Sequence, residues 1–514
     1  MSGKNRMLGG FMTVGFWTLM SRILGFARDV MIAAFLGTGP AAQAFIVAFS
    51  LPNMFRRFFA EGAFNMAFVP MFSKKLQAGD DPHGFARDAF SGLATILIIL
   101  TVAAMVFMPW LVWAMASGFV GDTRFDLSVT YGRIAFPYIL FISLAALLSG
   151  VLNSLHRFTA AAAAPVLLNL IFITGLVFGW LLQADIGLLL SWMVPIAGVA
   201  QLALVWVAAK RAGFTLIPRL PVFTPDLKRL AMIAAPAALA GGVVQVNLLV
   251  GRQVASQFDS AVAWLYNADR LYQLPLGVVG IAIGIVLLPE LSRRLQAGDE
   301  TGGQDAFSRA GEISLALTIP AAIALVVIPL PLVEVLFQRG KFGPDDTAAT
   351  AAAVQIYGLG LPAFVLQKIY QPLFFARADT KTPFYYALVA MIINAALAIG
   401  LAPVIGYLAA AIGATVASWG MVVLLWLGSR RMGASARFDT RFKHRIWRIL
   451  IASIVMGAVL LAAQLLLNPM FGAGAWRYLA LTLLVGLGMV SYFAAGQITG
   501  AFKLSDFRRY MRRS

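Results

Sequence analysis

The chain has 514 residues, of which 60% are hydrophobic and only 12% are charged. Soluble domains carry about 25% charged residues, so a soluble fold of this length could not cover its surface, and the chain is too apolar to be disordered. The composition therefore predicts an all-α polytopic membrane protein. The absence of cysteine excludes disulfides and thiolate metal sites, and the three scattered histidines exclude a metal cluster built from histidine.

The N-terminus begins with two basic residues, Lys4 and Arg6, followed by an apolar stretch. A signal peptide has the same order, but this stretch continues past Leu19 to Arg22 without a small-residue cleavage site, so we interpret it as a retained span. A span needs about 20 apolar residues, and the apolar segments predict about fourteen transmembrane helices. Their ranges are 8–36, 41–70, 88–117, 127–154, 159–183, 186–209, 227–256, 261–290, 307–337, 347–376, 382–402, 407–429, 446–467 and 475–499.

The net charge of +18 lies mainly in alternate loops between these spans. One set of loops and both termini hold 28 lysines and arginines, whereas the opposite set holds only Arg124, Arg339, Lys341 and Arg477. Because loops that stay in the cytoplasm are enriched in basic residues, both termini are predicted to be cytoplasmic, which requires an even number of spans.

An internal repeat predicts two lobes. Residues 70–81 (PMFSKKLQAGDD) recur as 289–300 (PELSRRLQAGDE), an offset of 219 that places the second span on the eighth. We therefore predict an N-terminal lobe of six helices at 1–220, a similar lobe at 221–433, and two extra helices with a basic tail at 434–514. Parallel repeats of this kind occur in transporters, with the substrate site between the lobes.

Eight basic residues remain inside the predicted spans. Each costs roughly 2.5–3.5 kcal/mol at a helix centre, so such residues usually face a watery cavity and mark a substrate path. The acids inside the membrane that might neutralise them are few, namely Asp29, Glu61 and Asp269. The cationic excess predicts an anionic substrate. The eight residues are Arg22, Arg28, Arg56, Arg57, Arg133, Arg252, Arg270 and Lys368. Of these, Arg133 and Lys368 lie near the ends of their spans, where extension of the side chain to the membrane surface is favoured over a substrate role.

The polar residues gather on spans 1, 2, 7 and 8, which the repeat makes the first pair of each lobe. Span 2 carries a stripe on one helical face, and the eighth begins with a polar cluster. Simple ion pairs are an open alternative to a substrate role, both for Arg57 with Glu61 and for Arg22 with Asp29. Six positions separate Arg22 from Arg28, which points them about 120° apart on a straight helix. The polar residues are Ser50, Asn53, Arg57, Glu61 and Asn65 on span 2, Gln245, Arg252 and Ser256 on span 7, and Asn267, Asp269, Arg270 and Gln273 on span 8.

Several segments resemble the MurJ (MviN) family of bacterial lipid II flippases, which belongs to the multidrug/oligosaccharidyl-lipid/polysaccharide exporter superfamily. They are 21–29 (SRILGFARD), 51–64 (LPNMFRRFFAEGAF), 68–70 (FVP), 268–271 (ADRL) and 287–289 (LLP).

The resemblance implies two six-helix lobes plus two C-terminal helices that form a groove for the polyprenyl tail. The implied substrate is lipid II, an undecaprenyl-diphosphate glycan, moved from the inner to the outer leaflet of the bacterial inner membrane by alternating access. The family's cavity arginines match Arg22, Arg28, Arg56 and Arg270, and arginine forks suit a diphosphate. The supporting or gating residues expected around them are Asp29, Asn53, Arg57, Glu61, Arg252, Asp269 and Gln273.

Two departures from the family pattern remove negative charge. Gln43 and Gln273 stand where many members have an acid, so gating ion pairs that use those acids are not expected. Some members resemble sodium binders, but here only Asn247 and Asn394 remain on the seventh and eleventh spans, without a carboxylate. We therefore expect no cofactor, metal or sodium coupling, and the membrane potential stays open as the energy source.

The expected partners are lipid II, membrane lipids and the cell-wall synthesis machinery, and no nucleic acid. Alternative functions are a flippase for another polyprenyl-diphosphate glycan, a drug or cation antiporter, and a membrane-embedded glycan-processing enzyme. An antiporter site should favour acids over arginines. An enzyme would need a carboxylate or histidine constellation, which the short extracytoplasmic loops lack, so no catalytic residue is predicted.

Overall fold

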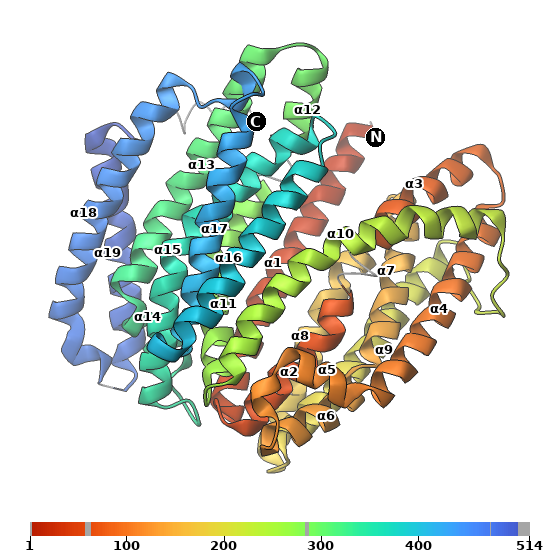
Figure 1. The fold of residues 1–514 in the computed structure, drawn as a ribbon, viewed down its shortest axis with the longest axis horizontal. Helices are drawn as coiled ribbons and strands as arrows, with labels where there is room; N and C mark the ends of the chain where they lie inside the picture. Colours follow the sequence, from red (N-terminus) through yellow and green to blue (C-terminus); the bar gives the residue numbers. More distant parts are fainter. Residues whose placement is uncertain (1–2, 57–62, 283–286, 473, 502–514) are drawn as a thin grey trace. The chain divides into compact units, whose positions relative to one another are not determined.

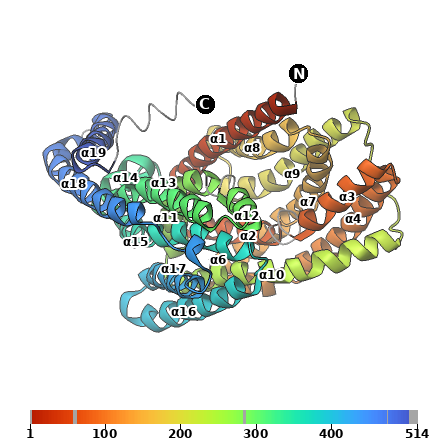
Figure 2. The same cartoon turned by 90° about the horizontal axis from the view of Figure 1, so that it is seen from above.

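The structure is a computed structural model in which every described element is a helix (Figures 1 and 2). It describes the backbone of residues 3–56, 63–282, 287–472 and 474–501. Within these ranges the side chains of 3–12, 63–66, 235–244, 246, 278–282 and 288–289 are not described. The all-α prediction is confirmed for the described part of the chain.

Contacts divide the chain into two compact units. Unit 1 comprises Met1–Ala263 and Arg339–Phe342, and unit 2 comprises Trp264–Gln338 and Gly343–Ser514. The predicted lobe limits at 220 and 433 stay a prediction.

The helices of unit 1 are α1 (Gly3–Leu36), α2 (Pro40–Arg56), α3 (Ala63–Ala78), α4 (Pro82–Val106), α5 (Met108–Met115), η2 (Ser117–Phe119), α6 (Thr123–Ala135), α7 (Tyr138–Ser154), α8 (Thr159–Leu181), α9 (Ile186–Arg211) and α10 (Pro225–Ser256). The next helix, α11 (Ala261–Ala282), begins in unit 1 and continues into unit 2. The others of unit 2 are α12 (Leu288–Gln296), α13 (Glu300–Val327), α14 (Pro329–Phe337), α15 (Pro344–Phe375), α16 (Lys381–Ile405), α17 (Leu408–Ser429), η4 (Ala434–Ala436), α18 (Thr440–Phe471) and α19 (Trp476–Thr499).

Three ranges predicted as single helices are each divided in two. The range 88–117 holds α4 and α5, 127–154 holds α6 and α7, and 307–337 holds α13 and α14. A proline follows or occupies each break, at Pro109, Pro137 and Pro329. Proline has no N–H and its ring clashes with the preceding turn, which ends the first helix of each pair.

Ten stretches of helix in the described part of the chain are long and apolar enough to cross a membrane. They do not include α1, α2, α3, α10, α11 or α12. These helices correspond to the predicted spans 8–36, 41–70, 227–256 and 261–290, which are the four that carry most of the polar and charged residues.

The two copies of the repeat adopt the same local structure at a helix end. Gly79 ends α3 with φ +68° and Gly298 ends α12 with φ +72°. The N–H of the next residue donates to the carbonyl five residues earlier, at 3.1 Å in the first copy and 2.9 Å in the second. Asp81 and Asp299 then cap the following helices by accepting a backbone N–H at 2.9 and 2.8 Å. The repeated sequence therefore encodes a glycine-terminated helix, whereas the capping aspartate differs by one repeat position, because Asp81 corresponds to Glu300 and Asp299 to Asp80.

An ion cluster joins α3 to α10 within unit 1. The Lys75 Nζ lies 2.7 Å from Asp80 Oδ2 and 3.0 Å from Asp226 Oδ2. The hydrogen bond to Asp80, followed by that to Asp226, raises the pKa of Lys75 above its ordinary value. Since Asp226 lies in the first turn of α10, this contact fastens the start of that helix to the end of α3.

A buried carboxylate fastens α18 to α13 in unit 2. Glu312 on α13 is only 6% exposed and accepts hydrogen bonds from Arg309 and Arg445. Arg309 also bonds to Asp439, the residue that caps α18. The Tyr492 hydroxyl of α19 donates to a carbonyl of α13 at 2.6 Å. The two C-terminal helices are therefore bound to α13 by directional polar contacts besides their apolar core.

Candidate functional site

The two predicted arginines of α1 lie in different surroundings. The side chain of Arg22 is exposed, whereas Arg28 is buried. This difference agrees with the angle of about 120° that six helical positions produce. Arg22 can therefore present its guanidinium fork to an anion without rearrangement of unit 1, while Arg28 is already occupied.

Arg28 is the centre of a hydrogen-bonded cluster with Asp29, Asn169 and Ser21 that joins α1 to α8, here called the Arg28 clasp. Its Nε and Nη2 donate to Asp29 Oδ1 at 3.0 and 2.8 Å, and its Nη1 donates to Asn169 Oδ1 at 3.0 Å. The Asn169 amide in turn donates to the Ser21 carbonyl at 2.9 Å and to the Ser21 hydroxyl at 3.3 Å. Asn169 thus bonds to α1 at two levels, one of which is the substrate-binding arginine predicted from the sequence.

The charged and polar side chains of the clasp are buried among apolar neighbours. The side chains of Arg28 and Asp29 are 9% and 3% exposed, and Asn169 is 4% exposed. The Arg28 guanidinium lies 5.5 Å from the centre of the Phe172 ring and 5.9 Å from that of Phe49. Removing one member of a buried charge pair typically costs about 3–5 kcal/mol, because the other charge stays buried without a partner. The cluster is therefore important for the stability of unit 1, whatever it binds.

The predicted polar face of span 2 is described only in part. Asn53 donates its side-chain amide to the Phe49 carbonyl at 2.8 Å, one turn earlier on α2. Arg56 is half-buried at the last position of that helix. Arg57 and Glu61 lie outside the described residues, so their predicted ion pair stays a prediction.

The departure at Gln43 leaves a buried amide. Gln43 lies on α2 with 2% of its surface exposed, and its Oε1 accepts no hydrogen bond from the described residues. The Gln43 side chain is therefore closed to solvent within unit 1.

The end of α10 is joined to the α5–η2 segment through Gln253, a residue that was not predicted from the sequence. Its Oε1 accepts from the Ser117 N–H at 2.9 Å and the Ser117 hydroxyl at 2.8 Å. Its Nε2 donates to the carbonyls of Trp113 at 2.9 Å and Ala114 at 2.6 Å. Its sequence neighbour Arg252, one of the predicted cavity residues, is half-buried.

The predicted cluster on α11 forms local contacts in unit 2. Arg270 donates to the Tyr266 hydroxyl at 2.9 Å, and its guanidinium lies 4.5 Å from the centre of the same ring. Asp269 accepts a hydrogen bond from Gln273, so the residue that replaces the family's acid here acts as a donor to its neighbour. Arg270 and Asp269 are both half-buried.

Each unit thus brings part of the predicted set together. Unit 1 joins Arg28 to Asp29, and unit 2 joins Asp269 to Gln273. Asn169 was not among the predicted site residues; an amide in the middle of an apolar helix needs partners, and this signal could have marked it. Among the described residues no group of three or more metal-ligating side chains lies together.

A family model and protein relatives agree on one family. A family model described as "Lipid II flippase MurJ" matches residues 32–486. A protein of Rhizobium meliloti (strain 1021) named "Probable lipid II flippase MurJ" is 46% identical over 513 residues, covering 98% of this chain and 96% of the relative.

Solved structures show the same fold at lower identity. A structure titled "Lipid II flippase MurJ, inward closed conformation" matches with a TM-score of 0.79 and 23% identity, covering 95% of this chain and 98% of that one. An inward-facing multidrug resistance transporter of the MATE family matches with a TM-score of 0.69 and 15% identity, covering 82% and 98%.

Proposed function

The chain belongs to the lipid II flippase MurJ family, and we propose that it moves lipid II from the inner to the outer leaflet of the cytoplasmic membrane by alternating access. The family match over residues 32–486 is the observation that carries this proposal. Members of the family are transporters and not enzymes, and this chain is a multi-pass membrane protein of the inner membrane.

We propose that Arg22, Arg28, Arg56 and Arg270 bind the diphosphate of the substrate. The exposed guanidinium of Arg22 supports a direct contact, because it can offer two parallel N–H donors to a phosphate. Arg28 is held by Asp29 and Asn169, so its contribution requires either a change of hydrogen-bond partner or an electrostatic effect from within unit 1. The remaining predicted residues, among them Arg57, Glu61 and Arg252, are proposed to support or gate this site.

The membrane topology is part of the proposal. Fourteen spans, two six-helix lobes and cytoplasmic termini are supported by the distribution of basic residues, 28 against 4, and by the presence of a described helix in each predicted range. Interaction with cell-wall synthesis enzymes is likewise a proposal, as is a driving force from the membrane potential without sodium. The lack of a carboxylate on the predicted seventh and eleventh spans beside Asn247 and Asn394 supports the last point.

The test measures lipid II in the outer leaflet of cells depleted of their own flippase, using a probe that reaches only that leaflet. Expression of this chain should restore outer-leaflet lipid II. Arg22→Ala should abolish most of the recovery and Arg22→Lys part of it, since lysine keeps the charge but not the fork. Arg133→Ala is the matched control, because Arg133 is also an exposed arginine on a helix and donates to the Met105 carbonyl.

Two outcomes count against the proposal. If the wild-type chain at normal membrane levels leaves lipid II inaccessible, the flippase function is wrong. If Arg22→Ala recovers as well as Arg133→Ala, Arg22 has no part in substrate binding, although the function itself stands.

A further inference from the structure

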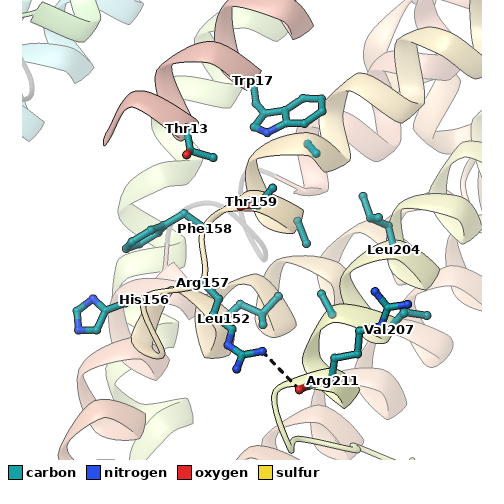
Figure 3. Close-up of a pocket in the computed structure, with 13 residues that line it drawn as sticks. Thr13, Trp17, Leu152, His156, Arg157, Phe158, Thr159, Leu204, Val207 and Arg211 are labelled. Carbon is teal, nitrogen blue, oxygen red and sulfur yellow. Dashed lines mark hydrogen bonds between the residues drawn. The ribbon is translucent and has the colours of Figure 1, made fainter. Parts of the chain in front are cut away.

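Unit 1 contains a pocket at the ends of its helices that lies apart from the Arg28 clasp. Its volume is about 720 Å³ (Figure 3). It is bounded by the first half of α1, the loop between α7 and α8, the start of α8 and the end of α9. The lining residues are Thr13, Trp17, Leu152, His156, Arg157, Phe158, Thr159, Ala160, Ala163, Leu204, Val207, Ala208 and Arg211.

The lining has two chemical characters. Most of it is apolar, with Trp17 of α1 facing Leu204 and Val207 of α9 across the pocket in Figure 3. Two arginines, Arg157 and Arg211, supply the charge, and both are exposed. The pocket therefore has an apolar interior and a positively charged rim formed by Arg157 and Arg211.

The two arginines keep most of their donors available. The Arg157 Nη1 donates to the Arg211 carbonyl at 3.4 Å, a long bond between the side chain of Arg157 and the backbone of Arg211. Neither guanidinium forms a salt bridge with a carboxylate of the described part of unit 1. Arg219 of the same unit, by contrast, is bonded to Asp88. Two guanidinium groups that line one pocket without a carboxylate partner in the described part of unit 1 raise the local potential and favour an anion with several acceptor oxygens.

The pocket lies where α7 ends, α8 begins and α9 ends, at Ser154, Thr159 and Arg211. The ends of membrane-crossing helices lie at the boundary between water and lipid, and the charge distribution predicts that this boundary is the cytoplasmic one. A soluble anion would leave the apolar walls in contact with water, and an uncharged lipid would leave the arginines without partners. An anionic amphiphile would cover the apolar walls and would also give the two arginines a partner.

We propose that this pocket binds an anionic phospholipid of the surrounding bilayer, with the headgroup phosphate on Arg157 and Arg211 and part of one acyl chain against Trp17, Leu204 and Val207. A volume of about 720 Å³ lies within the roughly 300–1,000 Å³ of small-ligand sites, so it holds the headgroup region and the rest of the lipid extends into the membrane. The site is distinct from the proposed substrate arginines, and its occupant is a resident lipid that is not transported. Because Trp17 lies on the same helix as Arg22 and Arg28, the bound lipid contacts the helix that carries two of those arginines.

The test uses the purified full-length chain in neutral detergent, with binding of phosphatidylglycerol measured by native mass spectrometry. The rim variant is Arg157→Gln with Arg211→Gln. The matched control is Lys210→Gln with Lys228→Gln, which removes the same charge from two exposed lysines of unit 1 that do not line the pocket. A third variant, Ala163→Trp, fills the pocket without changing its charge.

We expect the rim variant to weaken the first bound phosphatidylglycerol at least tenfold, since a charge-assisted hydrogen bond contributes about 10- to 150-fold in binding. The affinity of the control for phosphatidylglycerol should stay within threefold of that of the wild type, and Ala163→Trp should also weaken this binding. Phosphatidylcholine should bind to the wild type at least tenfold more weakly than phosphatidylglycerol. Three results would overturn the proposal: equal loss in the control, equal binding of phosphatidylcholine, or displacement by glycerol phosphate at concentrations comparable to those of the lipid. The last result would identify a soluble-anion site. Lipid II flipping is not read in this assay, so its outcome is independent of the proposed function.

Discussion

Replacement of Asn169 by alanine should destabilise unit 1 by separating α1 from α8. The change removes the acceptor of Arg28 Nη1 at 3.0 Å and the donor to the Ser21 carbonyl at 2.9 Å. A hydrogen bond to a charged group is worth about 1.5–3 kcal/mol and a neutral one about 0.5–1.5 kcal/mol, so the sum is about 2–4.5 kcal/mol. At about 2–4 °C per kcal/mol for a unit of this size, the melting temperature should fall by roughly 4–18 °C.

The assay is thermal unfolding of the purified protein in detergent, followed by the loss of the monodisperse peak in size-exclusion chromatography. Asn153→Ala is the control, because Asn153 is an exposed asparagine of the same unit whose side chain forms no hydrogen bond among those described. Asn169→Asp separates the two contacts: it keeps an acceptor for Arg28 but cannot donate to Ser21, so it should melt between the alanine variant and the wild type. Equal melting of Asn169→Ala and Asn153→Ala would refute the clasp.

Four further outcomes follow from the sequence and the structure. Gly118→Ala should reduce folded protein strongly, because a Cβ there would lie 2.4 Å from the Ser256 carbonyl oxygen, whereas Gly251→Ala, with nothing within 4 Å, should express normally by fluorescence-detected chromatography. Glu312→Gln should lower stability by about 1.5–3 kcal/mol in thermal unfolding, since Arg445 loses its hydrogen bond to a carboxylate whereas Arg309 keeps Asp439; an unchanged melting temperature would contradict the assigned role. A reporter fused after Ser514 should be active in the cytoplasm, and periplasmic activity would exclude fourteen spans. Flipping in proteoliposomes should be unchanged when sodium is replaced by potassium, and a clear decrease would show that sodium coupling exists.

The helix pattern was predictable because apolar runs and turn residues are local properties of the sequence. Every predicted range contains a described helix, yet the breaks at Phe107, Pro137 and Ile328 were missed. Proline is tolerated inside other membrane helices, such as α15 at Pro362, so its presence does not say which helices divide. Whether the helix continues depends on neighbours that replace the lost hydrogen bond, and these are set by tertiary structure.

The candidate site was predictable in its residue types and less so in its pairings. Spacing rules assume that adjacent helical residues do not face each other, so Arg28 and Asp29 were not paired in advance. The structure shows that the long arginine side chain turns back to its neighbour and to Asn169, which is 141 positions away in the sequence. Likewise Gln253 was overlooked because its partners, Trp113 to Ser117, are about as distant. Hydrogen bonds between residues far apart in the chain produce no spacing pattern that a single sequence could show.

Gln253 also determines which part of α10 can move. Its amide oxygen accepts two hydrogen bonds and its amide nitrogen donates two, so every donor and acceptor of the side chain is paired. Displacement of the last turn of α10 from the α5–η2 segment breaks these four bonds, and it also breaks the bond from the Gly118 N–H to the Ser256 hydroxyl at 3.1 Å. The last turn of α10, α5 and η2 therefore move as one rigid piece. A bend in α10 during transport must occur before Gln253, and a crosslink between η2 and the end of α10 should leave such a bend free.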